Sequence, residues 1–444
     1  MLVSISQDHA TDARKNGAVV EGTMEYRTGV WSQIGVSSQT DVWRRRRVLT
    51  GLAGAGFAAT VGAPAIVRAA PSGKPVRVGG TLSLTGFLAQ TAVIHKIAAE
   101  MMVEDINSRN GFLGRPVEYV LLDDQSKPDV ARSLYEKLIT VDKVDLIQGP
   151  YATAPILAAM GVAQRYGKVM IQSSMGIPKL QTYDMAFPAT PFGPEPDKTY
   201  PNVLLDMMAS FPTPPKTIVV LTSKFPSAQF MAQGMRDQSE KRGVKVLLYL
   251  EYESGNRDFG AIAARVKEAN ADFLWVGSLG LESNQLLEAL RKLDYTPKNH
   301  FHLYPAPGPL ALSPDGDKAL CSTFLEPDEP FMSRPGMKKF AAQYNERATK
   351  ANLPYTIIDA QACGMISEWQ ILEAGVNGAN SLDDKAIAAW LKKNRVDTIY
   401  GTVQFDGPFN HGTALQLVKQ VQNKAWKVVW PKEFAAPGVK LIAS

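Results

Sequence analysis

Small hydroxyl side chains and glycines follow two neighbouring apolar segments of the chain. The segment 144–147 runs into Gly149-Pro150-Tyr151-Ala152-Thr153-Ala154-Pro155, and the segment 169–171 runs into Gln172-Ser173-Ser174-Met175-Gly176-Ile177-Pro178. Hydroxyls and free backbone amides at a helix N-terminus favour a carboxylate without any arginine. Simple N-capping by serine or threonine is the alternative. Because two adjacent segments end alike, we favour a ligand site for an anion.

The other reactive side chains form no catalytic or metal-binding pattern. His300 and His302 would share one face of a strand, but only two other histidines follow residue 69, so a metal site is disfavoured. Asp123-Asp124 could act as paired acids, although a solvated strand end is the commoner explanation. The glycines of 51–56 follow no predicted strand, which argues against a phosphate loop. We therefore expect no cofactor, no metal and no enzyme activity.

Four consecutive arginines, Arg44 to Arg47, stand before an uncharged Gly/Ala-rich stretch at 48–67. With small residues before Pro71, they form an export signal that we expect to be cleaved after Ala69. The pattern resembles a twin-arginine signal, so the chain should cross the membrane already folded. A transmembrane anchor is the alternative, but the glycines and the proline make the stretch too polar for it. Translation could also start at Met24.

The part of the chain after the signal has the size of two domains. It contains 444 minus 69, or 375, residues, and each domain could bury its own core. Of the 48 basic and 43 acidic residues, 8 and 5 precede residue 70, which leaves 40 and 38 and a net charge near plus two. A nucleic-acid partner would normally require a concentrated basic face, and the sequence indicates none. Cys321 and Cys363 could pair, but two buried free thiols are favoured.

From Pro75 onward, short apolar strands alternate with amphipathic helices, which specifies α/β domains with parallel sheets and helices on both faces. A Pro-rich stretch at 188–201 interrupts the alternation and predicts a domain boundary. The expected strands are 76–84, 117–122, 144–147, 169–171, 186–187, 217–221, 245–250, 273–276, 300–304, one containing Cys321, and the hairpin segments 402–405, 415–422 and 426–429. The expected helices are 90–108, 129–140, 155–166, 200–210, 228–242, 259–269, 283–292, 336–350, 357–374 and 383–394.

Several short motifs between residues 75 and 431 are specific in combination, although each alone is weak. They are Leu84-Thr85-Gly86, Val103-Glu104-Asp105-Ile106-Asn107, Gly111 to Val117, Asp123 to Pro128, Gln148 to Tyr151, Phe405-Asp406, Gln420 to Lys424 and Trp430-Pro431. Together they resemble the periplasmic solute-binding proteins of ABC importers, in the branch typified by the leucine/isoleucine/valine-binding protein.

The resemblance implies the type I periplasmic binding fold, in which two Rossmann-like lobes joined by three crossovers close on a ligand. The crossovers should fall near 189–192, 322–327 and 397–402. After the signal region 1–69, we expect lobe 1 to comprise 70–190 and 323–398, and lobe 2 to comprise 191–322. The segment 399–444 should supply the last crossover and a C-terminal hairpin on lobe 2.

In such proteins, hydroxyls and backbone amides of the first lobe bind the ligand carboxylate. The resemblance places Thr153 at the hydroxyl position, and Ser174 and Gly176 in a second loop where a threonine is usual in amino-acid binders. Gly176 removes that hydroxyl, for which Ser173 or Ser174 would compensate. The ligand contacts expected in this lobe are Phe87, Tyr151, Thr153, Ser173, Ser174 and Gly176.

The second lobe departs further from the family pattern. Ser227 and Leu279 stand where the family has an aromatic residue and a tyrosine, and Ala306 stands near the glutamate that pairs with the ligand's α-ammonium. A buried ammonium without a partner is strongly disfavoured, so either Glu282 replaces that glutamate or the ligand lacks an amine. We therefore expect that α-amino acids are not uniformly the best ligands. Aliphatic or aromatic carboxylates and amides are the alternatives.

The resemblance implies a periplasmic substrate-binding protein of a branched-chain amino acid-type ABC transporter, which hands its ligand to a permease driven by an ATPase. We expect a monomer whose hinge closure is stabilised by the ligand. An exported cofactor-dependent enzyme is a less favoured alternative, because the twin-arginine route often serves such enzymes. A sensory module, the third possibility, would need transmembrane and signalling segments in addition.

Overall fold

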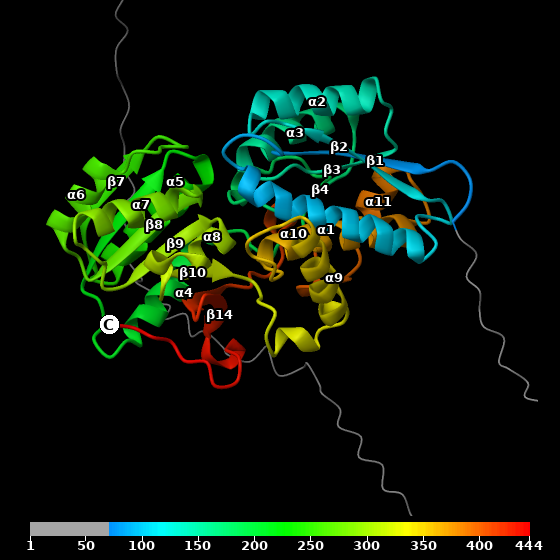
Figure 1. Ribbon diagram of the computed structural model, residues 1–444. Coiled ribbons are helices and arrows are strands. Elements are labelled where there is room, and N and C mark those ends of the chain that lie inside the picture. The colour runs from blue at the N-terminus through cyan, green and yellow to red at the C-terminus, as the bar shows by residue number, and fades with distance from the viewer. Residues whose placement is uncertain (1–70) are drawn as a thin grey trace, which may run out of the picture. The chain divides into compact units, whose positions relative to one another are not determined.

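The structure is a computed structural model that describes residues 71–444 (Figure 1). The described residues, 71–444, belong to one compact unit. The predicted export signal, its cleavage after Ala69 and the alternative start at Met24 lie outside the described residues. Within the described part, no helix combines the length and the apolar character that a membrane crossing requires.

Five parallel strands form the first sheet, in the order β2-β1-β3-β4-β5. Helices α2 (Pro128–Thr140) and α3 (Thr153–Tyr166) pack together on one face, and α1 (Ala89–Ser108) and α10 (Ala360–Ala379) pack together on the other (Figure 1). We call this layered unit lobe 1. Its strands are β1 (Val76–Leu82), β2 (Val117–Asp123), β3 (Leu146–Gln148), β4 (Met170–Gln172) and β5 (Ala186–Pro188).

Seven strands form the second sheet, in the order β14-β13-β10-β9-β8-β6-β7, which we call the sheet of lobe 2. The β10–β13 and β13–β14 pairs are antiparallel, and the other neighbouring strands of this sheet run parallel. The strands are β6 (Thr217–Ser223), β7 (Lys245–Tyr252), β8 (Phe273–Gly280), β9 (His300–Pro305), β10 (Leu320–Thr323), β13 (Leu417–Gln422) and β14 (Ala425–Trp430). Its helices are α4 (Pro196–Ala209), α5 (Pro226–Lys241), α6 (Gly260–Ala269), α7 (Glu282–Lys292) and α8 (Pro307–Leu312).

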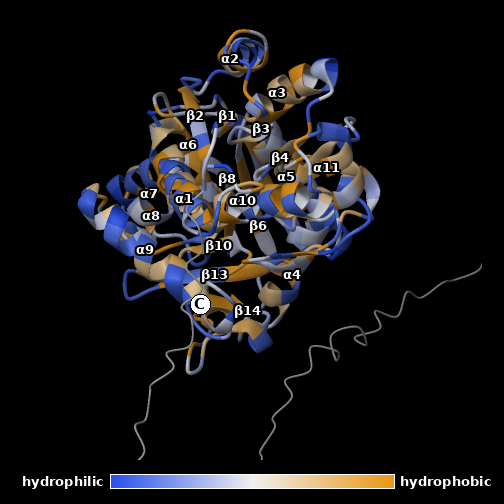
Figure 2. Ribbon diagram, turned by 90° about the vertical axis from the view of Figure 1, so that its right-hand side faces the viewer, coloured by the Kyte–Doolittle hydropathy of each residue, from blue (hydrophilic) through white to orange (hydrophobic). Residues whose placement is uncertain are grey.

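The remaining elements complete lobe 1. They are α9 (Met337–Lys350), α11 (Asp384–Leu391) and a small two-stranded sheet of β11 (Val396–Thr398) and β12 (Gly401–Val403). Figure 2 shows hydrophilic residues on outer helices such as α2 and hydrophobic residues on many strands. This distribution follows from the layered fold, because strands covered on both faces must be apolar throughout.

The predicted α/β class with two parallel-sheet cores is confirmed. Most element bounds agree within a few residues, but α10 begins at Ala360, later than predicted, because Asp359 caps it with an extended backbone (φ −135°, ψ −178°). Helix α4 begins earlier than predicted, since Pro196 occupies a first-turn position where no amide donor is needed. The predicted strand 402–405 was placed wrongly, because β12 pairs with β11 and not with the hairpin.

The chain passes between the two sheets three times. The first passage follows β5, and the second follows β10. The third lies later than the predicted 397–402, because Phe405 still packs on Phe187 of β5 with ring centroids 5.2 Å apart. Asn410 also donates to the Ala186 carbonyl at 2.8 Å. The exact lobe boundaries that we predicted stay a prediction.

Candidate ligand-binding site

A cavity of about 70 Å³ lies between the two lobes. Both lobes and two of the passages between them supply its walls. Of the ten predicted contacts, five line it: Tyr151, Ser173, Ser174, Ser227 and Leu279. A space this small admits only a small molecule when the lobes are in this position.

The two predicted loops of lobe 1 are hydrogen-bonded to each other. The Ala152 amide donates to Ser174 Oγ at 2.7 Å, and the Gly176 amide donates to Thr153 Oγ1 at 3.0 Å. Each hydroxyl therefore accepts a bond from the opposite loop and keeps its own proton to donate. Ser174 lines the cavity, so its hydroxyl proton is available to a ligand, whereas Thr153 is fully buried behind the cavity wall.

Lobe 2 brings further hydroxyls to the same place. A Cβ atom added at Gly176 would lie 2.8 Å from Ser227 Cβ, 3.3 Å from Tyr304 Oη and 3.5 Å from Thr153 Oγ1. Tyr304 lines the cavity, and its buried hydroxyl has no hydrogen-bond partner among the described residues. We call the hydroxyls of Ser174, Ser227 and Tyr304 the hydroxyl cluster of the cavity. Gly176 has no side chain, and this leaves room for the hydroxyl cluster beside it.

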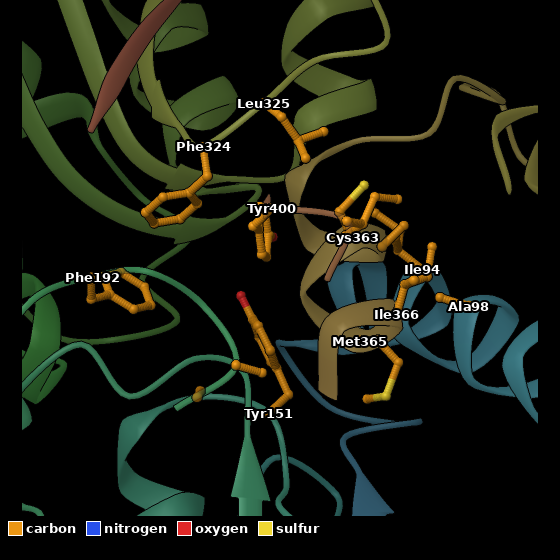
Figure 3. Packing of buried hydrophobic residues seen from close by; sticks show 14 of the residues in the cluster. Ile94, Ala98, Tyr151, Phe192, Phe324, Leu325, Cys363, Met365, Ile366 and Tyr400 are labelled. Atoms are coloured by element: carbon orange, nitrogen blue, oxygen red, sulfur yellow. The ribbon is translucent and has the colours of Figure 1, made fainter. Parts of the chain in front are cut away.

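Aromatic rings form another wall. The Phe192 and Phe324 ring centroids are 5.1 Å apart, and those of Phe324 and Tyr400 are 5.8 Å apart. Figure 3 shows the Tyr151 hydroxyl pointing toward Tyr400, with Phe192 and Phe324 on one side. Burial raises the pKa of Tyr151 well above its usual range, so the phenol is neutral at physiological pH.

Charged groups lie at the end of the cavity next to the passages between the lobes. Lys419 Nζ lies 2.7 Å from Glu326 Oε1 and 4.7 Å from the Trp426 ring centroid. Both charged side chains are almost fully buried. The carboxylates around Lys419 outweigh its burial and raise its pKa, so it stays protonated.

Asp359 is the carboxylate among the described residues that line the cavity. Its Oδ1 accepts from the Gln361 amide at 3.0 Å and from the Ala362 amide at 3.1 Å, which makes it the N-cap of α10. His95 also lines the cavity, with Nε2 3.2 Å from Gln361 Oε1. Burial lowers the pKa of His95 to about 4, so its imidazole is neutral.

The other predicted contacts lie outside the cavity wall. Glu282 does not reach it, because its carboxylate accepts from the Leu279 amide at 3.0 Å and the Gly255 amide at 2.7 Å. Ala306 is fully buried without lining the cavity. The Phe87 ring packs edge-on against Phe225 of lobe 2, with centroids 6.4 Å apart.

Sequence reasoning did not identify Asp359, Lys419 or His95. Two of them carried a signal. Lys419 interrupts an apolar strand, and Asp359 directly precedes a helix whose start we had predicted too early. His95 carried none, because it lies within an ordinary helix.

The remaining chemical candidates have structural roles. His300 Nδ1 and His302 Nε2 are 2.9 Å apart, and no cluster of metal-ligating side chains occurs in residues 71–444. We predicted a solvated strand end for Asp123-Asp124, and this is wrong for Asp124. Its side chain is fully buried and accepts from Ser83 Oγ at 2.6 Å. Cys321 and Cys363 are buried free thiols, which confirms the favoured alternative.

Comparison with known proteins places these features in a family. The chain matches the model of the periplasmic binding protein family over residues 75–425. It is 23% identical over 336 residues to the Leu/Ile/Val-binding protein of Escherichia coli strain K12, an alignment that covers 75% of this chain and 87% of that protein.

Two solved structures have a similar fold. A leucine-binding protein from Thermotoga maritima is 20% identical, with a TM-score of 0.68, and covers 82% of this chain and 99% of its own. A solute-binding protein of an ABC transporter from R. palustris, in complex with benzoate, is 18% identical, with a TM-score of 0.68, and covers 83% and 99%. The chain therefore belongs to the periplasmic binding protein family.

Proposed function

We propose that this protein is the substrate-binding component of an ABC importer and that its ligand is a small molecule with a carboxylate. The observation that carries this proposal is the hydroxyl cluster of the cavity, to which both lobes contribute. Several neutral donors around one point can replace the hydration shell of a carboxylate without adding a buried cation. A ligand held in this way bridges the two lobes.

Hinge closure is the mechanism that this arrangement supports. The lobes already touch beside the cavity, where Phe87 packs on Phe225 and Lys179 Nζ lies 4.6 Å from the Phe230 ring centroid. A ligand that contacts both lobes favours this position over an open one by its differential affinity. The open position would admit the ligand and release it to the permease.

An aromatic carboxylic acid is the second candidate ligand. The rings of Tyr151, Phe192 and Phe324 around the cavity favour it, because flat rings pack well against an aromatic ligand. The R. palustris protein of similar fold holds benzoate. The position of the family glutamate, Ala306 in this chain, leaves an amine without a partner from lobe 2.

The location and the partners belong to the same proposal. The relatives of this chain are periplasmic binding proteins, and we propose a periplasmic location reached by the twin-arginine route. The partners would be a permease and an ATPase at the membrane, and the protein would act as a monomer without enzyme activity.

A thermal-shift screen of the purified protein tests the function. Amino acids, aliphatic acids and aromatic acids would each be added, and tryptophan fluorescence would follow closure for every compound that raises the melting temperature. We expect at least one small carboxylate to do both, and its amide to be weaker. If no small carboxylate or amide stabilises the protein, the transport function loses its support.

A further inference from the structure

Asp359 has unused binding capacity in the cavity. Its side chain is only 2% exposed, and both neighbouring amides donate to the same oxygen, Oδ1. Within residues 71–444, Oδ2 accepts no hydrogen bond from another residue. A buried carboxylate oxygen usually has a partner, because its desolvation is costly.

The nearest cation is already engaged. Lys419 forms its ion pair with Glu326, and Thr323 Oγ1 supports that carboxylate at 2.9 Å. Burial raises the pKa of Asp359, and the charge of Lys419 opposes this shift through space. The three buried groups, Asp359, Glu326 and Lys419, nevertheless carry two negative charges against one positive charge when all are ionised. A cationic group in the cavity would balance them.

His95 cannot supply that cation. Its imidazole is neutral, its Nε2 faces Gln361, and its Nδ1 has no hydrogen-bond partner in the described structure. The residue is 1% exposed and lines the same cavity as Asp359. An unpartnered nitrogen and an underused carboxylate in the wall of one cavity indicate that a polar ligand group binds there.

We propose that Asp359 receives a protonated amine of the ligand, so that the ligand is an amino-substituted carboxylic acid. This inference rests on the proposed function, since the hydroxyl cluster must hold the ligand's carboxylate. It also gives the ligand's amine the partner that Ala306 cannot provide. The amine finds its partner on α10 of lobe 1, not on lobe 2.

The test compares matched ligands that differ only in the amine. Titration calorimetry would measure leucine against 4-methylpentanoate and phenylalanine against 3-phenylpropanoate, on the wild type and on Asp359→Asn. Asparagine is as good an N-cap as aspartate, so α10 should keep its start. Asp383→Asn is the matched control, because Asp383 caps α11 in the same way, with Oδ1 2.8 Å from the Ala386 amide and away from the cavity.

The wild type should bind at least one amino acid about 10- to 100-fold more tightly than its deaminated analogue, the range of a hydrogen bond to a charged group. Asp359→Asn should lose this preference and bind the deaminated acid no more weakly, while Asp383→Asn should keep it. Equal amino-acid affinity in the wild type and Asp359→Asn would overturn the inference. So would a wild type that binds benzoate or the deaminated acids but neither amino acid, although the proposed function would then stand. A protein that binds none of these acids refutes both.

Discussion

A close approach between the lobes at Gly176 predicts how a single methyl group would affect ligand binding. Gly176 lies in the second loop of lobe 1, and a Cβ atom at this position would lie 2.8 Å from Ser227 Cβ on α5 of lobe 2. Because Gly176 does not need a positive φ, alanine fits its backbone. The substitution Gly176→Ala should therefore leave each lobe intact and oppose only their contact.

The expected magnitude follows from packing. Two carbon atoms attract best at about 3.5 to 4.0 Å, so the lobes would have to separate by more than half an ångström at this point. Overfilling a packed site costs about 1 to 3 kcal/mol. If that cost falls on the closed state alone, the dissociation constant should rise about 5- to 150-fold.

The assay is calorimetric titration with whichever acid the thermal-shift screen identifies. Without ligand, the melting temperature of Gly176→Ala should equal that of the wild type, because an open state avoids the clash. The double variant Gly176→Ala with Ser227→Gly removes the nearest atom and should bind as tightly as the single variant Ser227→Gly, which lacks the serine hydroxyl but has no clash. Wild-type affinity in Gly176→Ala would refute the reasoning, since it would mean that the lobes do not approach at Gly176 in the ligand complex.

Three further predictions concern buried polar groups. Tyr304→Phe removes a hydroxyl without a partner, so stability without ligand should change by less than about 0.5 kcal/mol while affinity for the carboxylate falls; unchanged affinity would exclude this contact. Lys419→Met should lower the free energy of unfolding by about 3 to 5 kcal/mol, and adding Glu326→Gln should restore much of it in urea titrations, because the single change leaves a buried carboxylate unpaired. Burial lowers the pKa of His411 to about 4, below its value in the unfolded chain, so its contribution to stability is complete above pH 6.5 and is lost as pH falls toward 4. His411→Gln should therefore reduce the loss of stability between pH 7.5 and pH 5, and an undiminished loss would contradict this.

The sequence was sufficient for the hydroxyl loops because their position depends on local rules. Thr153, Ser173 and Ser174 follow strands of one parallel sheet, and parallel strands end at the same edge. Their proximity needs no knowledge of the second lobe. Ser227, which lies at the start of α5 after β6, was predicted from the family resemblance instead.

The charged end of the cavity could not be predicted in this way. Asp359, Glu326 and Lys419 come from α10, from the passage after β10 and from β13, and only the paths between the lobes bring them together. Each had an ordinary explanation in its own segment, as a helix residue, a loop residue or a strand residue. Glu282, by contrast, was a reasonable candidate near the cavity, but its first-turn position directs its oxygens to local amides.

The passages between the lobes are also part of the cavity wall, and this couples ligand shape to closure. Thr190 and Phe192 belong to the first passage, and Ser322 and Phe324 belong to the end of β10 and the second. A ligand that packs on these side chains contacts the segments whose backbone must bend when the lobes move.

The aromatic packing extends this coupling to lobe 1. Tyr400 contacts Phe324, and its hydroxyl donates to the Ala360 carbonyl at 2.7 Å, next to Asp359. A change in the angle between the lobes would therefore shift the aromatic wall and the start of α10 together. A ligand whose apolar surface fits the aromatic wall but whose polar group does not match Asp359 would disturb the wall and the helix start. The reason is that Asp359 and the carbonyl that binds Tyr400 lie at the same start of α10. Selectivity in this protein should thus depend on the passages as much as on the two loops that first indicated a site.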